Sequence, residues 1–172
     1  MARLGIISDT HGLLRPEALA FLQGSDRILH AGDIGRAEVL TRLSAIAPVT
    51  AVRGNIDKGA WAEAIRETEL LEFGGLSIYA IHDVSRLRID PAVRIHVVAS
   101  GHSHKPGIER REDIIFINPG SAGPRRFKLP ISVAELIIEG GSIASSRILE
   151  LQPGGWPRLL GCGHLKVSRG SL

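Results

Sequence analysis

Short runs of apolar residues alternate with helical patterns along the first half of the chain. Apolar runs at residues 3–8, 27–30 and 48–52 have the length and aliphatic character of buried strands. Between them, residues 16–21 begin with a proline, which the first turn of a helix tolerates, and residues 36–46 place apolar side chains on one helical face. Strands that alternate with helices are typical of parallel βαβ units, so this half predicts an α/β fold.

The second half of the chain is richer in strands. Two hairpins are predicted, over residues 69–81 and 131–149, each with a pair of glycines at its turn. Between them, apolar runs at residues 95–99 and 114–117 are typical of two further strands. The segment around Trp61 shows no clear pattern.

The last twenty residues differ from the rest. Residues 153–172 carry many glycines and no clear period, so we expect a poorly ordered or peripheral tail after one domain at residues 1–152. This tail holds Arg158, Lys166 and Arg169 and no acidic residue, which leaves the domain with equal numbers of basic and acidic side chains. The net charge of +3 therefore gives no support to a nucleic-acid-binding face.

Composition predicts the compartment. The chain has no apolar run of about 20 residues, the length of a membrane helix, and its start shows no signal-peptide pattern. Its single cysteine, Cys162, allows no disulfide within the chain, which fits a reducing environment. We expect a cytoplasmic protein without a membrane partner. The sequence leaves the oligomeric state open, and a homo-oligomer is compatible with it.

Polar side chains of metal-binding type follow the predicted strands, at the sheet edge where α/β folds form their sites. They are Asp9 and His11 after the first strand, Asp33 after the second, Asn55 and Asp57 after the third, His82 after the first hairpin, and His102 and His104 after the strand at residues 95–99. Carboxylate, imidazole and carboxamide groups suit Mn²⁺, Fe²⁺, Co²⁺, Ni²⁺ or Zn²⁺. They are too many for one ion and suit two ions that share a bridging carboxylate.

The same residues resemble the motif blocks of a known family. Asp9-x-His11, Gly32-Asp33, Gly54-Asn55-x-Asp57, His82 and Gly101-His102-x-His104 are similar, in order and spacing, to the five blocks of the calcineurin-like metallophosphoesterases. The run at residues 29–33 and the turn at residues 118–121 resemble the family's small bacterial and archaeal phosphodiesterases. The resemblance covers about residues 1–150 and implies a sandwich of two mixed β-sheets flanked by helices, with two metal ions at one edge.

The resemblance also implies a role for each residue. The first metal ion would be held by Asp9, His11 and His104, the second by Asn55, His82 and His102, and Asp33 would bridge the two. Catalytic roles would fall to Asp33, Asn55 and His82. Asp57 would lie outside the ligands and either orient an imidazole by accepting its second N–H or serve only the turn in which it lies. Mn²⁺ is the expected metal, with Ni²⁺, Co²⁺, Fe²⁺, Zn²⁺ and Mg²⁺ as alternatives, and the substrate-binding residues are unknown.

The activity implied by the resemblance is hydrolysis of a small phosphodiester by a hydroxide that bridges two metal ions. One alternative is a phosphomonoesterase. Another is a non-catalytic scaffold for protein contacts, because a eukaryotic retromer subunit resembles these enzymes and has lost part of the ligand set. A scaffold has no reason to keep every ligand type, and this chain keeps them all, which favours the enzyme.

Two positions depart from the family pattern. Many members have a histidine directly after the Asn of the third block, placed to protonate the leaving group, and this chain has Ile56 there. His82 is followed by Asp83, where the family usually has a glycine and then a histidine. The sequence therefore does not identify the general acid.

Other polar residues have simpler interpretations. His30 and His96 lie in or beside apolar runs, and we interpret both as structural histidines with satisfied hydrogen bonds. The turn at residues 118–121 is either only a tight turn or part of the site edge. The cations Lys105, Arg125 and Arg126 either form a solvated face or attract an anionic substrate.

Overall fold

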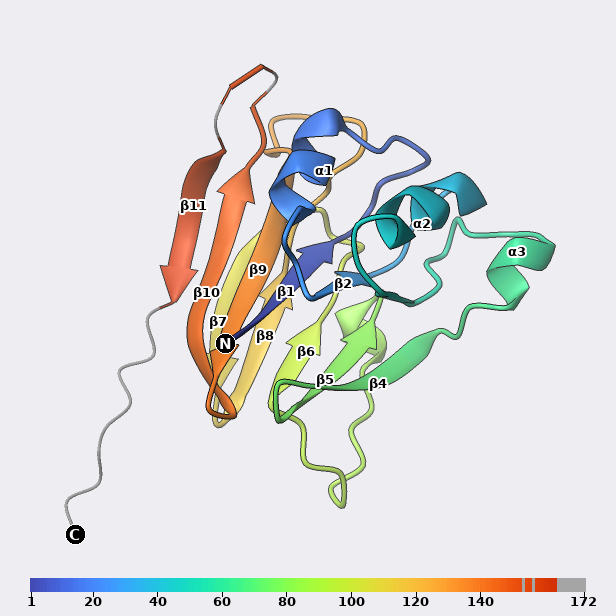
Figure 1. The fold of residues 1–172 in the computed structure, drawn as a ribbon. Helices are drawn as coiled ribbons and strands as arrows, with labels where there is room; N and C mark the ends of the chain where they lie inside the picture. The colour runs from blue at the N-terminus through green and yellow to red at the C-terminus, as the bar shows by residue number, and fades with distance from the viewer. Residues whose placement is uncertain (153, 156, 164–172) are drawn as a thin grey trace, which may run out of the picture.

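The computed structural model describes residues 1–152, 154–155 and 157–163, and these form two β-sheets packed face to face (Figure 1). The six-stranded sheet has the order β11 (Arg158–Gly163), β10 (Ser142–Glu150), β9 (Ser132–Glu139), β1 (Ala2–Ile7), β2 (Arg27–His30) and β3 (Val49–Ala51). The five-stranded sheet has the order β4 (Thr68–Phe73), β5 (Leu76–Ile81), β6 (Val97–Ala99), β8 (Ile114–Asn118) and β7 (Gly107–Arg111). Both sheets are mixed, so the fold implied by the sequence is confirmed.

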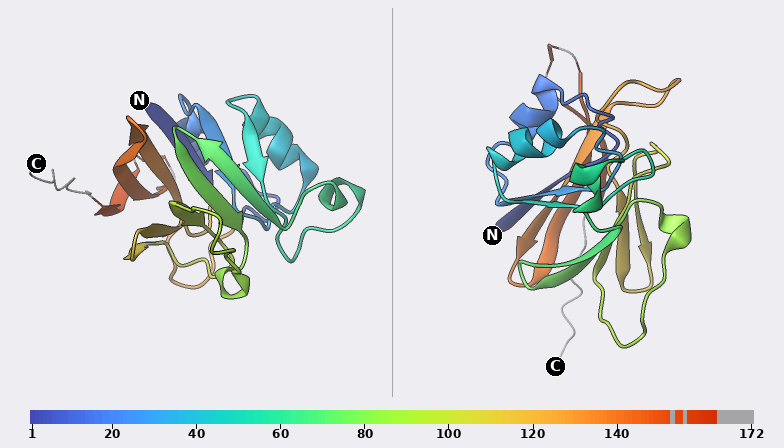
Figure 2. Two further views of the ribbon diagram at one scale, coloured as in Figure 1. Left: turned by 90° about the horizontal axis from the view of Figure 1, so that it is seen from below. Right: turned by 90° about the vertical axis from the view of Figure 1, so that its right-hand side faces the viewer.

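The helices are short and few. On the outer face of the six-stranded sheet lie α1 (Pro16–Leu22) and α2 (Ala37–Ser44), while the other sheet covers the inner face (Figure 2). The connections carry α3 (Ala60–Glu63) and one 3₁₀ turn, η1 (Val84–Arg86). Among the described residues, no helix has the length and apolar character needed to cross a membrane.

The direction of the parallel strands determines which edge of the molecule carries the candidate ligands. In the six-stranded sheet β1, β2 and β3 run parallel, and in the five-stranded sheet β5, β6 and β8 run parallel. Antiparallel neighbours flank each parallel set, with β9 beside β1, β4 beside β5 and β7 beside β8. The carboxyl ends of both parallel sets therefore carry the loops that follow β1, β2, β3, β5 and β6, and these loops meet at one edge.

The second half of the strand β1 is buried on both faces, which explains the apolar run at residues 4–7. Leu4 and Ile6 pack into the core between the two sheets, and Ile7 packs into the core beneath the helices. At Gly5 the helix α1 comes so close that an added Cβ would lie 2.5 Å from a methyl carbon of Leu22. Gly5 therefore allows α1 to pack tightly on β1.

Four elements are absent from the sequence-based expectations, namely α3, η1, β7 and β11. The strand β7 is exposed at the edge of its sheet, so it lacks the apolar pattern that marks a buried strand. The helix α3 spans a single turn, in the segment around Trp61 that gave no pattern.

Part of the expected tail forms a strand at the edge of the sheet. Residues Arg158–Gly163 form β11, an edge strand paired antiparallel with β10. Leu159 and Leu160 are exposed, so β11 is attached mainly by its backbone ladder and has little apolar signal. The expectations for residues 153, 156 and 164–172 lie outside the described residues.

Candidate metal centre

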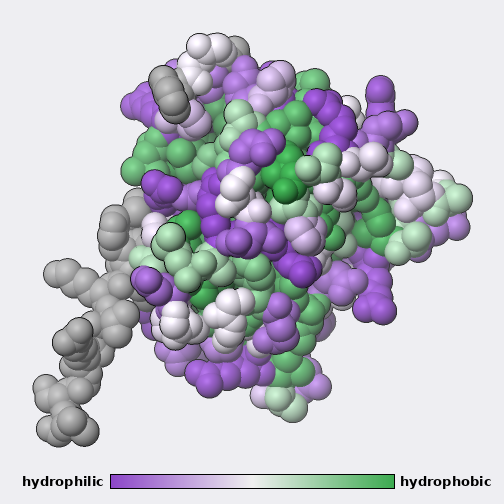
Figure 3. Space-filling model, in the orientation of Figure 1, coloured by the Kyte–Doolittle hydropathy of each residue, from purple (hydrophilic) through white to green (hydrophobic). Residues whose placement is uncertain are grey.

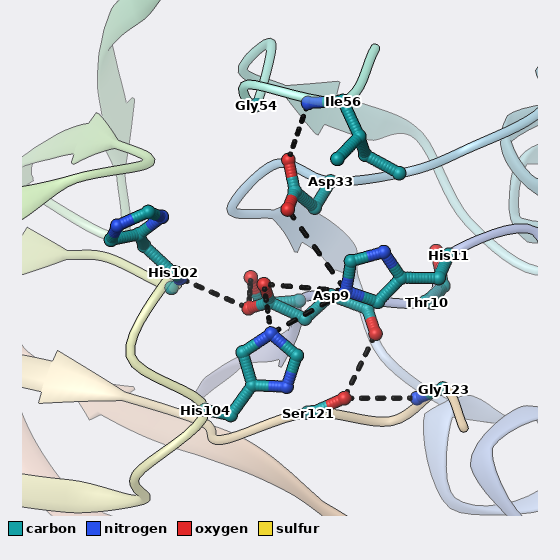
Figure 4. Close-up of polar contacts among 12 residues, drawn as sticks. Asp9, Thr10, His11, Asp33, Gly54, Ile56, His102, His104, Ser121 and Gly123 are labelled. Atoms are coloured by element: carbon teal, nitrogen blue, oxygen red, sulfur yellow. Dashed lines mark hydrogen bonds and ion pairs between the residues drawn. The ribbon is translucent and has the colours of Figure 1, made fainter. Parts of the chain in front are cut away.

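The loops at the carboxyl ends of both parallel sets converge, and their polar side chains face one another (Figure 4). The six-stranded sheet contributes Asp9, His11, Asp33 and Asn55 from the loops after β1, β2 and β3, and the five-stranded sheet contributes His82, His102 and His104 from the loops after β5 and β6. All seven candidate ligands are thus brought to one edge, between the two sheets.

The first cluster consists of Asp9, His11 and His104, whose ligand atoms all lie within 4.8 Å of one another. The Nε2 atom of His104 lies 3.1 Å from Asp9 Oδ1 and 3.4 Å from the Nε2 atom of His11. The two imidazole rings are stacked, with centroids 5.3 Å apart. Two imidazole nitrogens and one carboxylate oxygen directed to one point can serve as three ligands of a divalent ion.

The second cluster lies beside the first. Asp33 and His82 share a 4.8 Å group with Asp9, and the Nε2 atom of His82 is 3.2 Å from Asp33 Oδ1. The amide oxygen of Asn55 lies 3.2 Å from His82 Nε2 and 3.1 Å from His102 Nδ1. Asn55, His82 and His102 therefore offer an oxygen and two nitrogens around a second point.

Two carboxylates lie between the clusters, and the directions of their oxygens distinguish them. Asp9 is within reach of both clusters, but its Oδ2 accepts hydrogen bonds from Ser8 Oγ at 2.6 Å and from the backbone N–H of His102 at 3.1 Å, which leaves only Oδ1 without a hydrogen bond among the described residues. Asp33 directs its oxygens to different sides, with Oδ2 at 4.0 Å from His11 Nε2 and Oδ1 at 3.2 Å from His82 Nε2, although Oδ1 also accepts the backbone N–H of Ile56. Because Asp33 presents one oxygen to each cluster, its geometry suits a bridge.

Burial makes this group of side chains costly unless a cation is bound. Asp9 Oδ1 and His104 Nδ1 are buried and make no hydrogen bond within the described part of the chain. Burial raises the pKa of Asp9 to about 6, although the hydrogen bond from Ser8 opposes the shift. Burial, together with the positive charge of Arg126, lowers the pKa of His104 to about 4. An unsatisfied carboxylate oxygen beside neutral imidazoles fits a divalent cation.

A hydrogen bond to the backbone fixes the orientation of His82. His82 donates its Nδ1–H to the carbonyl oxygen of Ala31 at 2.7 Å, which leaves its Nε2 facing Asp33 and Asn55. Burial acts to lower the pKa of His82, but its bonds to Asp33 and Ala31 outweigh burial and raise it. Such a bond sets the tautomer of a ligating imidazole.

His30 is confirmed as a structural histidine. It is fully buried, its Nδ1 accepts the N–H of Gly32 at 3.2 Å, and its Nε2–H donates to Thr10 Oγ1 at 2.9 Å. Burial lowers its pKa to about 3, so the ring is neutral. The Thr10 hydroxyl in turn donates to the carbonyl oxygen of Ile34 at 2.9 Å. These hydrogen bonds join the loop after β1 to the loop after β2.

The backbone at the site is held in an uncommon conformation. Left-handed φ angles occur at five of the seven candidate ligands, namely Asp9 (53°), His11 (48°), Asp33 (53°), His102 (65°) and His104 (58°). Non-glycine residues rarely adopt this region, and such strain gathers at functional sites where the surrounding structure enforces it. The loops thus adopt unfavourable backbone conformations that direct the side chains of the candidate ligands toward one another.

Two glycines allow the loops to approach each other. Gly32 has a φ of 94°, and an added Cβ would lie 2.6 Å from His82 Nδ1. At Gly101 an added Cβ would lie 2.6 Å from Asp9 Oδ2 and would collide with Ser8 Oγ. The glycines that precede Asp33 and His102 in the motif blocks are therefore required by close packing around the ligands.

Asp57 is bound by backbone groups of two loops. Its carboxylate accepts the backbone N–H groups of Gly35 and Gly54, each at 2.8 Å, and among the described residues it has no hydrogen bond with an imidazole. Of the two roles that the sequence left open, these bonds fit a role in the loops, because the loop after β2 and the loop after β3 both direct backbone donors at the carboxylate. Asp57 is buried and ties together the loops that carry Asp33 and Asn55.

The turn at residues 118–121 is part of the site edge. Ser121 donates its hydroxyl to the backbone carbonyl of Asp9 at 2.9 Å, and the N–H of Gly123 lies 3.4 Å from the same hydroxyl oxygen (Figure 4). Asn118 donates its amide to the carbonyl of Gly101 at 2.7 Å. Sequence reasoning left this turn open, and only its position directly after an apolar strand signalled the role.

Ile56 lies where a histidine would be placed to protonate a leaving group. Its side chain is 39% exposed, and its backbone N–H donates to Asp33 Oδ1 at 3.1 Å. Ile56 therefore helps to hold the Asp33 carboxylate through its backbone N–H, and its side chain has no proton to donate to a leaving group.

Comparisons with known proteins agree with this geometry. Residues 2–141 match the family model described as the calcineurin-like phosphoesterase superfamily domain. A probable metallophosphoesterase of Methanothermobacter thermautotrophicus is 38% identical over 151 residues, which cover 80% of this chain and 86% of that protein.

Solved structures share the fold. The phosphoesterase YfcE from E. coli has a TM-score of 0.71 at 22% identity, with 94% of this chain and 98% of that chain covered. Chaetomium thermophilum Vps29 has a TM-score of 0.76 at 19% identity, with 95% and 96% covered. At these identities the likeness shows the fold alone, whereas the family model and the archaeal relative cover most of the chain. The chain therefore belongs to the calcineurin-like phosphoesterase superfamily.

Proposed function

We propose that this protein is a phosphoesterase that works with two divalent metal ions and prefers phosphodiesters. The observation that carries the proposal is the pair of adjacent ligand clusters with Asp33 between them, one carboxylate oxygen directed to each side. Asp9, His11 and His104 would hold one ion, and Asn55, His82 and His102 the other. Mn²⁺ is the first metal to test, followed by Ni²⁺, Co²⁺, Fe²⁺, Zn²⁺ and Mg²⁺.

The chain's own residues would position and protect the reaction. Two bound divalent ions supply hydroxide from water near neutral pH and neutralise charge on the phosphoryl oxygens. Asp33 fixes the spacing of the two positions, while Asn55 and His82 stand beside it with their ligand atoms already in place. Ala31 holds the tautomer of His82. The rigid loops would thus present a preorganised site, so little rearrangement is needed when substrate binds.

The preference for diesters rests on Ile56. A positioned general acid is typically worth about 10²–10⁴-fold in rate, and isoleucine cannot donate a proton. Rate should then depend strongly on the pKa of the leaving group, so an aryl diester should react well and an alkyl monoester poorly. A diester also carries one negative charge where a monoester carries two. The smaller charge suits this site, because the carboxylates of Asp9 and Asp33 would already neutralise part of the charge of the metal ions.

The test compares turnover of bis-p-nitrophenyl phosphate, p-nitrophenyl phosphate and an alkyl monoester, each with Mn²⁺ and with EDTA. We expect metal-dependent turnover that is fastest with the diester and slowest with the alkyl monoester. Equal or faster turnover of the alkyl monoester would contradict the diester preference and favour a phosphomonoesterase. Absence of turnover with every metal and ester would contradict the enzyme and favour a scaffold.

A further inference from the structure

A cavity of about 260 Å³ opens beside the second ligand cluster. Three of the residues that line it, Asn55, His82 and His102, are candidate metal ligands. The rest of its wall comes from Arg53, the start of β4, the strand β5 and the segment at residues 83–88. An ester group held at the second cluster therefore has an open space directly beside it. On the face drawn in Figure 3, hydrophilic residues form a band across the middle, between areas that are more hydrophobic.

The cavity wall is rich in guanidinium groups. Arg53, Arg86 and Arg88 all line it, whereas its acidic residues are Glu67 and Asp83. The carboxylate of Asp83 is occupied locally, because it accepts the backbone N–H of Ser85 at 3.0 Å and the Ser85 hydroxyl at 2.8 Å. The lining therefore carries one more positive than negative charge before any metal ion is bound.

Glu67 already shows that this wall binds a carboxylate. Its Oε1 lies 3.1 Å from Arg53 and its Oε2 lies 3.8 Å from Arg86. The side chains of Glu67 and Arg86 are 58% and 70% exposed, and such exposed ion pairs contribute little stability. An anion from solution can therefore replace Glu67 at a small cost, and Arg88 adds a further cation that no acidic side chain within the described residues neutralises.

The remaining lining is apolar enough for an organic group. Tyr79 and Ile81 face the cavity from β5, and Tyr79 packs against a small hydrophobic cluster of the five-stranded sheet. The cavity thus combines a ligand cluster at one side, carbon surface along β5 and guanidinium groups along the wall. These three surfaces suit a molecule with three parts: a phosphoester at the ligand cluster, a short organic arm along β5 and a second anion at the guanidinium groups.

We propose that the cavity binds the organic arm of the substrate and that the preferred substrate is a phosphoester whose arm carries a second anionic group, a carboxylate or a phosphate. The proposal rests on the phosphoesterase function proposed above and specifies its substrate class. Guanidinium groups recognise both anions through paired hydrogen bonds, and Arg86 and Arg88 are the residues that select them.

The experiment uses binding rather than turnover. Methyl(phenyl)phosphinate and its 4-carboxylate derivative differ only in the second anion, and both organic groups are joined to phosphorus by carbon bonds that resist hydrolysis. Calorimetry with the Mn²⁺-loaded protein should show that the carboxylate derivative binds about tenfold more tightly, the value of one charge-assisted hydrogen bond. A third probe with a phosphonate in place of the carboxylate identifies which anion the cavity prefers.

Three variants distinguish recognition of the second anion from a purely structural role of the arginines. The double variant Arg86→Gln/Arg88→Gln should reduce the ratio of the two affinities to about one, and Arg110→Gln on the exposed strand β7 should leave it unchanged. Glu67→Gln removes the competing carboxylate, so it should tighten binding of the two probes that carry a second anion and leave the affinity of the probe without one unchanged.

Equal affinity of the three probes for the wild type, or a ratio that the double variant leaves intact, would overturn the substrate class. Metal-dependent hydrolysis of bis-p-nitrophenyl phosphate in the same preparation would then show that the phosphoesterase function itself stands. Absence of that hydrolysis would instead remove the function on which the proposal rests.

Discussion

Asp57 provides a sharp test of how the site is held together. Its buried carboxylate accepts two backbone N–H groups at 2.8 Å, from Gly35 in the loop after β2 and from Gly54 in the loop after β3. In Asp57→Asn one oxygen becomes an NH₂ group, which faces a backbone donor and cannot accept its proton. One buried N–H then lacks a partner, which costs about 1–3 kcal/mol, and the remaining bond loses the benefit of a charged acceptor.

We therefore expect Asp57→Asn to lower the free energy of unfolding by about 2 kcal/mol, which for a chain of this size is about 4–8 °C in Tm. The same change should loosen the loops that carry Asp33 and Asn55. Residues that hold ligands from outside typically affect metal affinity by about 10–100-fold, so Mn²⁺ binding should weaken within that range.

The assay is thermal unfolding with EDTA and with Mn²⁺, together with calorimetric titration of Mn²⁺. Asp113→Asn is the matched control, because the Asp113 side chain is fully exposed and pairs only with Arg110 at 3.4 Å among the described residues. That control should change the free energy of unfolding by less than about 0.5 kcal/mol. A variant at Asp57 that melts and binds Mn²⁺ like the wild type would refute the argument that its carboxylate ties the two loops together.

Three further predictions test other parts of the molecule. Ile56→His should raise turnover of an alkyl monoester without changing metal content, and an unchanged rate would mean that the leaving group is protonated from elsewhere. Glu135→Ala should lower the free energy of unfolding by about 1–3 kcal/mol, as measured by denaturant titration, because this buried carboxylate binds both Arg3 and Arg147; a stability like that of the wild type would show that the ion pairs contribute nothing. A chain that ends at Gln152 lacks β11 and should keep its turnover while Tm falls by a few degrees, whereas insoluble protein would show that β11 is needed to cover the edge of β10.

Most of the fold was predictable because its central strands are buried on both faces. The runs at residues 4–7 and 28–29 are apolar and fully buried, and polar residues follow each run where the chain reaches the edge of the sheet. The candidate ligands follow these stops directly, so the sequence indicated which side chains would gather at one edge. The edge strands β7 and β11 gave no such signal, because an exposed strand needs only backbone pairing and its side chains are free to vary.

The finer features of the site depend on distances between segments that are far apart in the sequence. The two directions of the Asp33 oxygens, the bond from His82 to Ala31 and the bond from Ser121 to Asp9 each join separate loops. Asp57 shows the limit most clearly, because its motif position indicated a role beside the ligands and only the structure shows that its partners are backbone groups. The arginine-lined cavity likewise draws on segments that are far apart in the sequence, and only the structure brings Arg53, Arg86 and Arg88 to one wall.

The central claim is that two metal ions bind side by side and share Asp33, and metal content per chain tests it most directly. Elemental analysis after saturation with Mn²⁺ and removal of free metal should give two ions per chain for the wild type. It should give less than one for Asp33→Asn, with turnover of bis-p-nitrophenyl phosphate lost in parallel, because both positions lose a charged ligand. A wild type that holds a single ion, or an Asp33→Asn variant that keeps two ions and full turnover, would contradict the account.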